Sequence, residues 1–191
     1  SVSALNSVIC LNGTTAINGS GANTYTYTSS LGTFSNGVAF SPSTTTTYTA
    51  FSTSTAGCTS TNNPVLTITV NALPNVSVSA LNSVICLNAT TALNGSGAIS
   101  YTFNSVSGTY SNGVSFTPSA TAVYTAVGTN SAGCTSSNNP VVTITVNPLP
   151  NISVNSGSIC IGNNFTLNPS GATVYVISGG TNIVSPTVTS N

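Results

Sequence analysis

The segment AGCTSTNNPVLTITVNALPN at residues 56–75 recurs almost unchanged as AGCTSSNNPVVTITVNPLPN at residues 132–151. Its centre, VLTITVN (65–71) in one copy and VVTITVN (141–147) in the other, alternates apolar and polar residues as a half-buried β-strand requires. Asn-Asn-Pro before the strand and Leu-Pro-Asn after it are typical of turns and linkers. The segment therefore predicts the last strand of a repeated β domain and the connection to the next copy.

The duplication extends over the whole chain. SVSALNSVICLN at residues 1–12 returns letter for letter at residues 77–88, and at this offset of 76 about 54 of 75 aligned positions are identical. A third copy opens with NISVNSGSIC (151–160) and runs to Asn191, a little over half a unit. A period of this length suits a small independent domain. We expect repeats at 1–75 and 76–151, and an incomplete third repeat at 152–191 that lacks its last strands.

Within each copy the local pattern is β throughout. TYTYT (24–28), VAFSP (38–42) and TTYTA (46–50) alternate and are rich in residues that favour strands. Asn36-Gly37 and Asn112-Gly113 predict short hairpins, because both residue types accept positive φ. No helical periodicity is present. The fold class is therefore predicted as all-β, with tandem immunoglobulin-like antiparallel β-sandwiches arranged as a rod.

The composition argues against catalysis, metal binding and binding to anionic partners. The sequence has 191 residues and contains no Asp, Glu, Lys, Arg or His. General acid–base catalysis depends on those side chains, so we predict no catalytic residues and no enzyme. Metal sites need clusters of carboxylates, Cys or His, so no metal or cofactor is expected. Without Lys or Arg, neither nucleic acid nor an anionic membrane surface is an expected partner. There is no transmembrane run and no signal-peptide pattern.

The cysteines predict structural disulfides. Cys10 and Cys58 are 48 residues apart, as are Cys86 and Cys134, so each complete repeat contains one pair. A metal or redox site would instead favour closely spaced Cys-x-x-Cys motifs. We therefore predict one disulfide within each repeat, between Cys10 and Cys58 and between Cys86 and Cys134. Disulfides of this kind indicate an extracellular or periplasmic compartment.

Cys160 matches Cys10 and Cys86, but its partner would fall beyond Asn191, so it is expected to be unpaired. Two explanations stay open for the incomplete third repeat. The chain stops within a domain, or a neighbouring subunit supplies the missing strand by β-augmentation. The alternating segment SVSAL (1–5), with Val2 and Ala4 on one face, is the candidate donor strand.

Proline marks the connections between repeats. ALPN (72–75) contains Pro74, and PLPN (148–151) contains Pro148 and Pro150. Proline restricts φ and removes a hydrogen-bond donor, so these linkers are expected to be short and semi-rigid. Near-identical domains joined in this way would form a regular rod.

A set of short motifs in one order suggests a family. Ile-Cys-Leu-Asn is followed by Leu-Asn-Gly-Ser-Gly-Ala, Tyr-Thr-Phe, Ser-Phe-Thr-Pro-Ser, Val-Tyr-Thr-Ala, Ala-Gly-Cys-Thr and Val-Asn-Pro-Leu-Pro. The chain thereby resembles the immunoglobulin-like, PKD-like tandem repeats of secreted and surface proteins of Bacteroidota, many of them exported by the type IX system. Members commonly have Trp where this chain has Tyr27 and Phe103, and often Asp before the Gly-Cys turn where it has Thr and Ser. The resemblance implies a stalk, spacer or adhesin array without shared catalytic residues.

The expected function is a structural repeat unit of an extracellular filament or adhesin stalk on the cell surface, which self-associates as a homo-oligomer or acts as a spacer. A carbohydrate-binding or other ligand-binding module is one alternative, although the alternating Tyr25, Tyr27, Tyr101 and Phe103 are better explained as core. A spacer within a larger secreted enzyme is the other. Glycans are a further expected partner, at the Asn-x-Ser/Thr sequences that begin at Asn12, Asn18, Asn75, Asn88, Asn94, Asn151 and Asn164.

Overall fold

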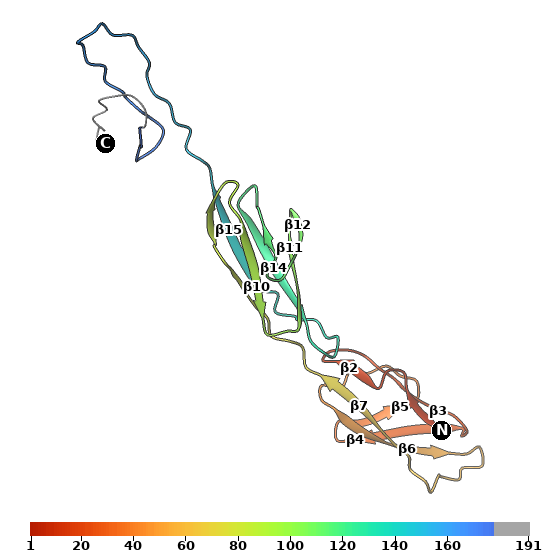
Figure 1. Ribbon diagram of the computed structural model, residues 1–191. Coiled ribbons are helices and arrows are strands. Elements are labelled where there is room, and N and C mark those ends of the chain that lie inside the picture. The colour runs from red at the N-terminus through yellow and green to blue at the C-terminus, as the bar shows by residue number, and fades with distance from the viewer. Residues whose placement is uncertain (178–191) are drawn as a thin grey trace.

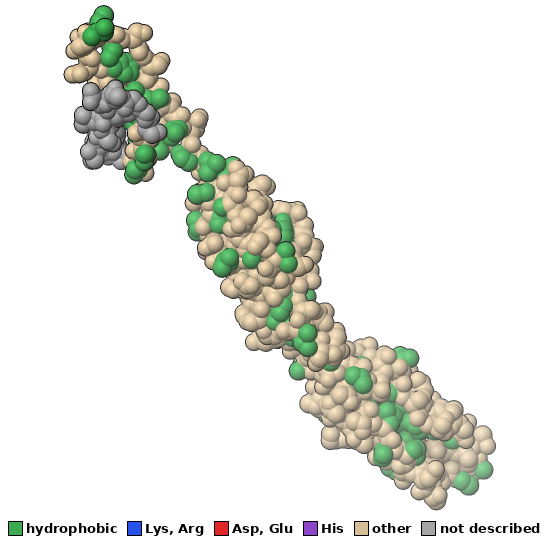
Figure 2. Space-filling view, viewed as in Figure 1, with side chains coloured by type: hydrophobic (Ala, Val, Ile, Leu, Met, Phe, Trp, Pro, Cys, Tyr) green, Lys and Arg blue, Asp and Glu red, His purple; other side chains and the backbone are tan. Residues whose placement is uncertain are grey.

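The computed structural model describes residues 1–177, which contain fifteen β-strands and no helix. Figure 1 shows two β units joined end to end, with the start of a third segment continuing beyond the second unit. The chain therefore forms an elongated array, which the space-filling view in Figure 2 also shows, and each β unit corresponds to one copy of the sequence repeat.

The first repeat is built from seven strands: β1 (Val2–Ala4), β2 (Val8–Cys10), β3 (Ile17–Gly19), β4 (Thr24–Ser29), β5 (Gly32–Ser35), β6 (Thr46–Thr53) and β7 (Val65–Asn71). Its larger sheet has the order β2-β7-β6-β4-β5. The smaller sheet pairs β1 with β3, and an isolated bridge between Thr15 and Phe40 extends it on the other side.

The second repeat contains the same elements in the same order: β8 (Ser77–Ala80), β9 (Val84–Cys86), β10 (Thr91–Ser96), β11 (Ser100–Ser105), β12 (Gly108–Ser111), β13 (Ser115–Phe116), β14 (Ala122–Thr129) and β15 (Val141–Asn147). One sheet has the order β12-β11-β14-β15-β9 and the other β13-β10-β8. The bridge of the first repeat has become the short strand β13, which pairs with β10.

The opening segment of each repeat crosses from one sheet to the other. In the second repeat β8 runs antiparallel to β10, whereas β9, four residues later, runs parallel to β15 in the facing sheet. The first repeat does the same with β1 against β3 and β2 against β7. Two facing sheets with this strand order, antiparallel except for the pairing of β2 with β7 and of β9 with β15, are typical of the immunoglobulin fold. The repeats are immunoglobulin-like β-sandwiches.

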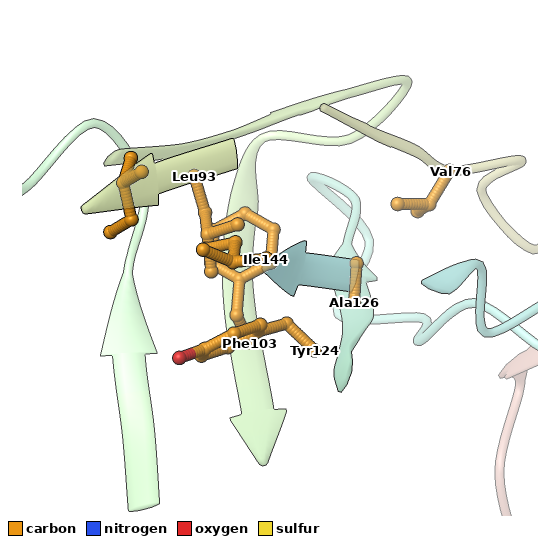
Figure 3. Packing of buried hydrophobic residues seen from close by; sticks show 7 residues of the cluster. Val76, Leu93, Phe103, Tyr124, Ala126 and Ile144 are labelled. Atoms are coloured by element: carbon orange, nitrogen blue, oxygen red, sulfur yellow. The ribbon is translucent and has the colours of Figure 1, made fainter. Parts of the chain in front are cut away.

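Each sandwich encloses a small apolar core. The first consists of Ile9, Ile17, Tyr27, Tyr48, Ala50 and Ile68. In the second, shown in Figure 3, the same six positions are Ile85, Leu93, Phe103, Tyr124, Ala126 and Ile144, and Val76 is added to them. Complete burial of a large apolar side chain contributes about 1.5–3 kcal/mol, so a few residues determine the stability of each repeat. The aromatic residues of β4 and β11 are part of these clusters, as the sequence predicts.

The expected hairpins are wrong, although the turns exist. Asn36-Gly37 follows β5, but the chain then crosses to the smaller sheet instead of pairing back on β5. The hairpin forms earlier, between β4 and β5, and ends at Gly32 with φ of 123°. The Asn36 side chain instead forms hydrogen bonds to both sheets. Its Oδ1 accepts hydrogen bonds from the Gly19 N–H at 2.7 Å and from the Tyr27 hydroxyl at 2.8 Å, and so ties the two sheets together.

The expected donor strand is already in use within its own repeat. Val2 and Ala4 lie in β1, where they pair with Gly19 and Ile17 of β3. Both side chains pack against the first core. Donating this strand to a neighbour would uncover that core, so the structure contradicts the interpretation of residues 1–5 as a free donor.

The start of the third repeat follows the pattern of the second. Ser153 bridges to Ser170 as Ser77 pairs with Ser96, and in both pairs the hydroxyl oxygens lie 2.7 Å apart. The prediction that this repeat lacks its last strands extends over residues 178–191, which lie outside the described part of the chain.

Candidate functional site: the joint between repeats

The two repeats meet at a joint formed by residues 72–76, which connect β7 to β8. Val76 is only 3% exposed and belongs to the core of the second repeat. Pro74 is half-buried beside it, whereas Pro148 and Pro150 of the next linker are exposed. Because its last residue is anchored in a core, the first linker cannot swing freely.

Asn138 holds this linker by three hydrogen bonds. Its Nδ2 donates to the Val76 carbonyl oxygen at 2.6 Å and to Asn75 Oδ1 at 2.9 Å. Its Oδ1 accepts from the Val76 N–H at 3.2 Å. One side chain from the loop before β15 therefore satisfies both backbone polar groups of Val76, as burial of that residue requires.

A second asparagine connects the linker to the loop that contains Cys134. The Asn130 Nδ2 donates to the Ala72 carbonyl oxygen at 2.8 Å. Its Oδ1 accepts from the N–H groups of Ala132 and Cys134, both at 3.0 Å. Asn130 thus fixes the shape of the cysteine loop and the path of the linker together.

Two glycines make room for the linker. A Cβ on Gly128 would lie 2.6 Å from the Val76 Cγ2. A Cβ on Gly97 would overlap the Asn75 carbonyl oxygen, and Gly97 also has φ of 95°. Glycine is required at such positions of positive φ and close backbone approach.

A disulfide crosses the joint. Cys10, at the end of β2 in the first repeat, is bonded to Cys134 of the second repeat, with an S–S distance of 2.01 Å and a Cα–Cα distance of 5.6 Å. The predicted bonds from Cys10 to Cys58 and from Cys86 to Cys134 are therefore wrong. Cys58 and Cys86 are free and exposed, and so is Cys160.

Strand geometry explains the correction. Cys10 is level with Asn71 at the end of β7, whereas Cys58 follows β6, which runs antiparallel to β7 and extends past its beginning. The two cysteines are separated by about ten residue steps along the sheet, roughly 30 Å at the usual rise per residue. A disulfide needs Cα atoms within about 7 Å. The two cysteines of one repeat therefore lie at opposite ends of the sandwich. Each is placed to bond with a cysteine of a neighbouring repeat, as Cys10 bonds with Cys134.

Titratable side chains are few and structural. Burial raises the pKa of Tyr48 above the usual tyrosine value, and burial followed by the effect of nearby Tyr110 raises that of Tyr124. Among the described residues neither hydroxyl lies at hydrogen-bonding geometry to a partner. Burial, followed by the effect of nearby Tyr25, also raises the pKa of Tyr27. Within residues 1–177 no group of three His, Cys, Asp or Glu residues could hold a metal. No helix in that part of the chain is long and apolar enough to span a bilayer.

Sequence reasoning missed the residues that build the joint. Asn138 lies in the Asn-Asn-Pro triplet, which reads as an ordinary turn, and Val76 reads as the first residue of a strand. A usable signal existed. An apolar residue occupies position 152 as well as position 76, in each case directly after a linker that ends in Pro-Asn.

Comparison with known proteins gives matches only among solved structures. No family model matches the chain, and a search of curated proteins gives no match. One similar structure, from a study of host cell surface retention of a 1.5-MDa bacterial ice-binding adhesin, is 17% identical, covers 78% of this chain and 64% of that chain, and has a TM-score of 0.41. A second, from a Ca²⁺-stabilised adhesin that helps an Antarctic bacterium to reach out and bind ice, is 20% identical with a TM-score of 0.42.

That second match covers 81% of this chain and 51% of the other, so this chain spans roughly one half to two thirds of the two adhesin chains. Fibronectin(III)-like modules of CbhA from Clostridium thermocellum are 8% identical and cover 76% of this chain and 95% of that chain, with a TM-score of 0.41. The strand order of the repeats, rather than these similarities, establishes the fold.

Proposed function

We propose that this chain is a structural segment of an extracellular bacterial adhesin stalk or filament, in which it acts as a spacer and catalyses no reaction. The observation that supports this proposal best is the construction of the joint. Val76 is buried in the next core, Asn138 binds both of its backbone polar groups, and the bond between Cys10 and Cys134 spans the two repeats. Apolar burial, hydrogen bonds and a covalent bond therefore act together at one place.

A stalk needs such joints, because a chain of domains on free linkers would collapse into a coil instead of keeping its ends apart. Repetition of one joint geometry would give a regular rod. The next linker repeats one close approach of this geometry, since a Cβ on Gly171 would overlap the Asn151 carbonyl oxygen as one on Gly97 would overlap that of Asn75. The absence of charged residues would also favour lateral or end-to-end self-association.

The proposal also includes the group of bacteria that exports the chain and the glycans on its surface. The motif order resembles Bacteroidota surface repeats, so export to the cell surface by the type IX system is part of it. Glycans at exposed asparagines such as Asn12 and Asn88 would keep an uncharged surface hydrated. Asn75 is the exception, because its Oδ1 accepts a hydrogen bond from Asn138 and a glycan there would disturb the joint.

Small-angle scattering in solution tests the spacer role. The oxidised chain should have a maximum dimension at least as large as that of two sandwiches in line, because the third segment continues beyond the second sandwich. The Cys10→Ser and Asn138→Ala double variant should show a broader distribution of end-to-end distances, while Asn62→Ala, at the equivalent position of the first repeat, should leave the distribution unchanged. A wild-type chain that samples bent and straight arrangements as widely as the double variant would exclude a rigid spacer.

A further inference from the structure

The first repeat contains an unfilled copy of the site that its own linker occupies on the second repeat. A hollow of about 310 Å³ lies where the chain enters the first repeat, with Ser1 among its lining residues. Ser20, Gly21, Tyr25, Ser52, Asn62 and Pro64 are among the residues that line it. Gly21, Ser52 and Asn62 lie 76 positions before Gly97, Gly128 and Asn138, the three residues that contact the linker at Asn75 and Val76 in the second repeat.

A second hollow, of about 390 Å³, continues the first and is lined by Gly21, Ala22, Asn23, Ser54 and Thr55. Ser54 corresponds to Asn130, which binds the Ala72 carbonyl in the second repeat. The two hollows together therefore follow the path that residues 72–76 take over the second repeat. We call them, with Cys58, the entry site of the first repeat.

Cys58 lies in the same loop of the first repeat as Cys134 does in the second, and it is exposed with a free thiol. The loop has the same internal hydrogen bonds. Ser54 N–H donates to the Cys58 carbonyl at 2.9 Å, and Asn130 N–H donates to the Cys134 carbonyl at 3.0 Å. The thiol that forms the inter-repeat bond in one repeat is thus presented in the same way, without a partner, in the other.

We propose that another repeat of this type lies directly ahead of Ser1 and that the entry site binds the linker after its last strand, the equivalent of residues 72–76. Cys58 then forms a disulfide with the Ile-Cys-Leu-Asn cysteine of that preceding repeat. The proposal rests on the joint and deepens the stalk function. Ser1 itself lines the hollow, so a single residue with the role of Val76 would lead from the linker into β1. By the same correspondence Cys86, which is equivalent to Cys10, would form the bond to the repeat that follows.

The chemistry is an ordinary thiol–disulfide exchange. Two thiols lose two protons and two electrons to form one disulfide, and a small-molecule disulfide such as oxidised glutathione accepts them and leaves as two thiols. The noncovalent contact would place the two sulfur atoms together, as it does for Cys10 and Cys134.

The two entry sites differ at four positions, and two of these differences fall at residues that contact the linker in the second repeat, which gives the proposal a graded test. Ser52 replaces Gly128, and its Cβ occupies the place where a Cβ would lie 2.6 Å from the valine methyl. Ser54 replaces Asn130 and lacks the amide that binds the linker carbonyl. We expect the bond at Cys58 to form more slowly than the bond between Cys10 and Cys134, and Ser52→Gly to accelerate it.

The experiment extends the full chain at its beginning. A copy of residues 77–151 followed by one valine is placed before Ser1, and the reduced protein is oxidised with oxidised glutathione. Alkylation and chymotryptic mapping then follow each cysteine, since trypsin has no site in a chain without Lys or Arg. Cys86 of the original second repeat is replaced by serine, because the peptides around Cys10, Cys86 and the added cysteine have the same sequence. Labelling of Cys58 should fall at least tenfold, with a new peptide that links it to an Ile-Cys-Leu-Asn segment, while Cys10 stays linked to Cys134. Asn62→Ala should slow the bond at Cys58 and leave the bond between Cys10 and Cys134 unchanged.

Cys58 that stays fully alkylated, in a chain whose Cys10–Cys134 bond has formed, would overturn the proposal. The unextended chain, oxidised over a range of concentrations, tests a second copy as the source. A Cys58-linked dimer that forms as readily as the intramolecular bond would overturn the assignment to a contiguous repeat. Both outcomes are separate from the scattering test, because a straight rod with a free Cys58 would contradict this inference and leave the stalk function supported.

Discussion

Replacing Cys10 with serine removes the disulfide at the joint, and we expect the loss to destabilise the second repeat although the substitution lies in the first. In the intact protein Cys10 is held level with Asn71 by the pairing of β2 with β7. When the second repeat unfolds alone, the bond therefore closes a loop of about 63 residues, from Asn71 to Cys134, and the chain-entropy model assigns such a loop about 4 kcal/mol.

The measurement is native-state hydrogen exchange of the peptide that covers β15, followed by mass spectrometry. Cys10→Ser should lower the free energy of unfolding of β15 by up to about 4 kcal/mol. Cys58→Ser is the matched control and should have no effect, because Cys58 has no partner in this chain. If the cysteines paired within repeats, Cys10→Ser and Cys58→Ser would instead destabilise the first repeat equally and leave β15 unchanged. That pattern would refute the reasoning.

The remaining predictions concern hydrogen bonds, buried hydroxyls and pH. Asn138→Ala should destabilise the second repeat by about 1–3 kcal/mol in urea titrations, since the backbone of buried Val76 loses its partners. Asn62→Ala should leave the free energy of unfolding unchanged. Tyr48→Phe should be neutral or stabilising by up to about 1 kcal/mol, because the buried Tyr48 hydroxyl has no partner among residues 1–177. Tyr27→Phe should cost about 1 kcal/mol through the lost bond to Asn36, and equal losses in the two variants would contradict this. Thermal stability should be constant between about pH 4 and 7, because no Asp, Glu or His is present. It should fall above about pH 10, where the unfolded chain loses tyrosine protons that the raised pKa values of Tyr27, Tyr48 and Tyr124 retain in the fold. A marked acid transition would contradict the pH prediction.

The sequence predicted the strands well because their information is local. Alternation in VLTITVN specifies a strand with one buried face, and the second copy repeats the evidence. The core positions followed from the same pattern, since Tyr27 and Ile68 are the inward residues of alternating segments. The hairpin at Asn36-Gly37 failed because a turn sequence specifies a local reversal but does not specify the sheet that the next segment joins.

The sequence by itself determined a tandem array of small β-sandwiches without side-chain groups for acid–base catalysis, because residue types, alternation and an exact period are properties of the chain alone. Only the tertiary structure decided how consecutive repeats are joined. The regular spacing of the cysteines favoured a bond inside each repeat. Cys10 and Cys58 lie at opposite ends of one sheet, however, and the bond forms between Cys10 of one repeat and Cys134 of the next. A strand carries its residues about 3.3 Å apart in a fixed direction, and this geometry, which sequence distance does not record, determines which cysteines meet.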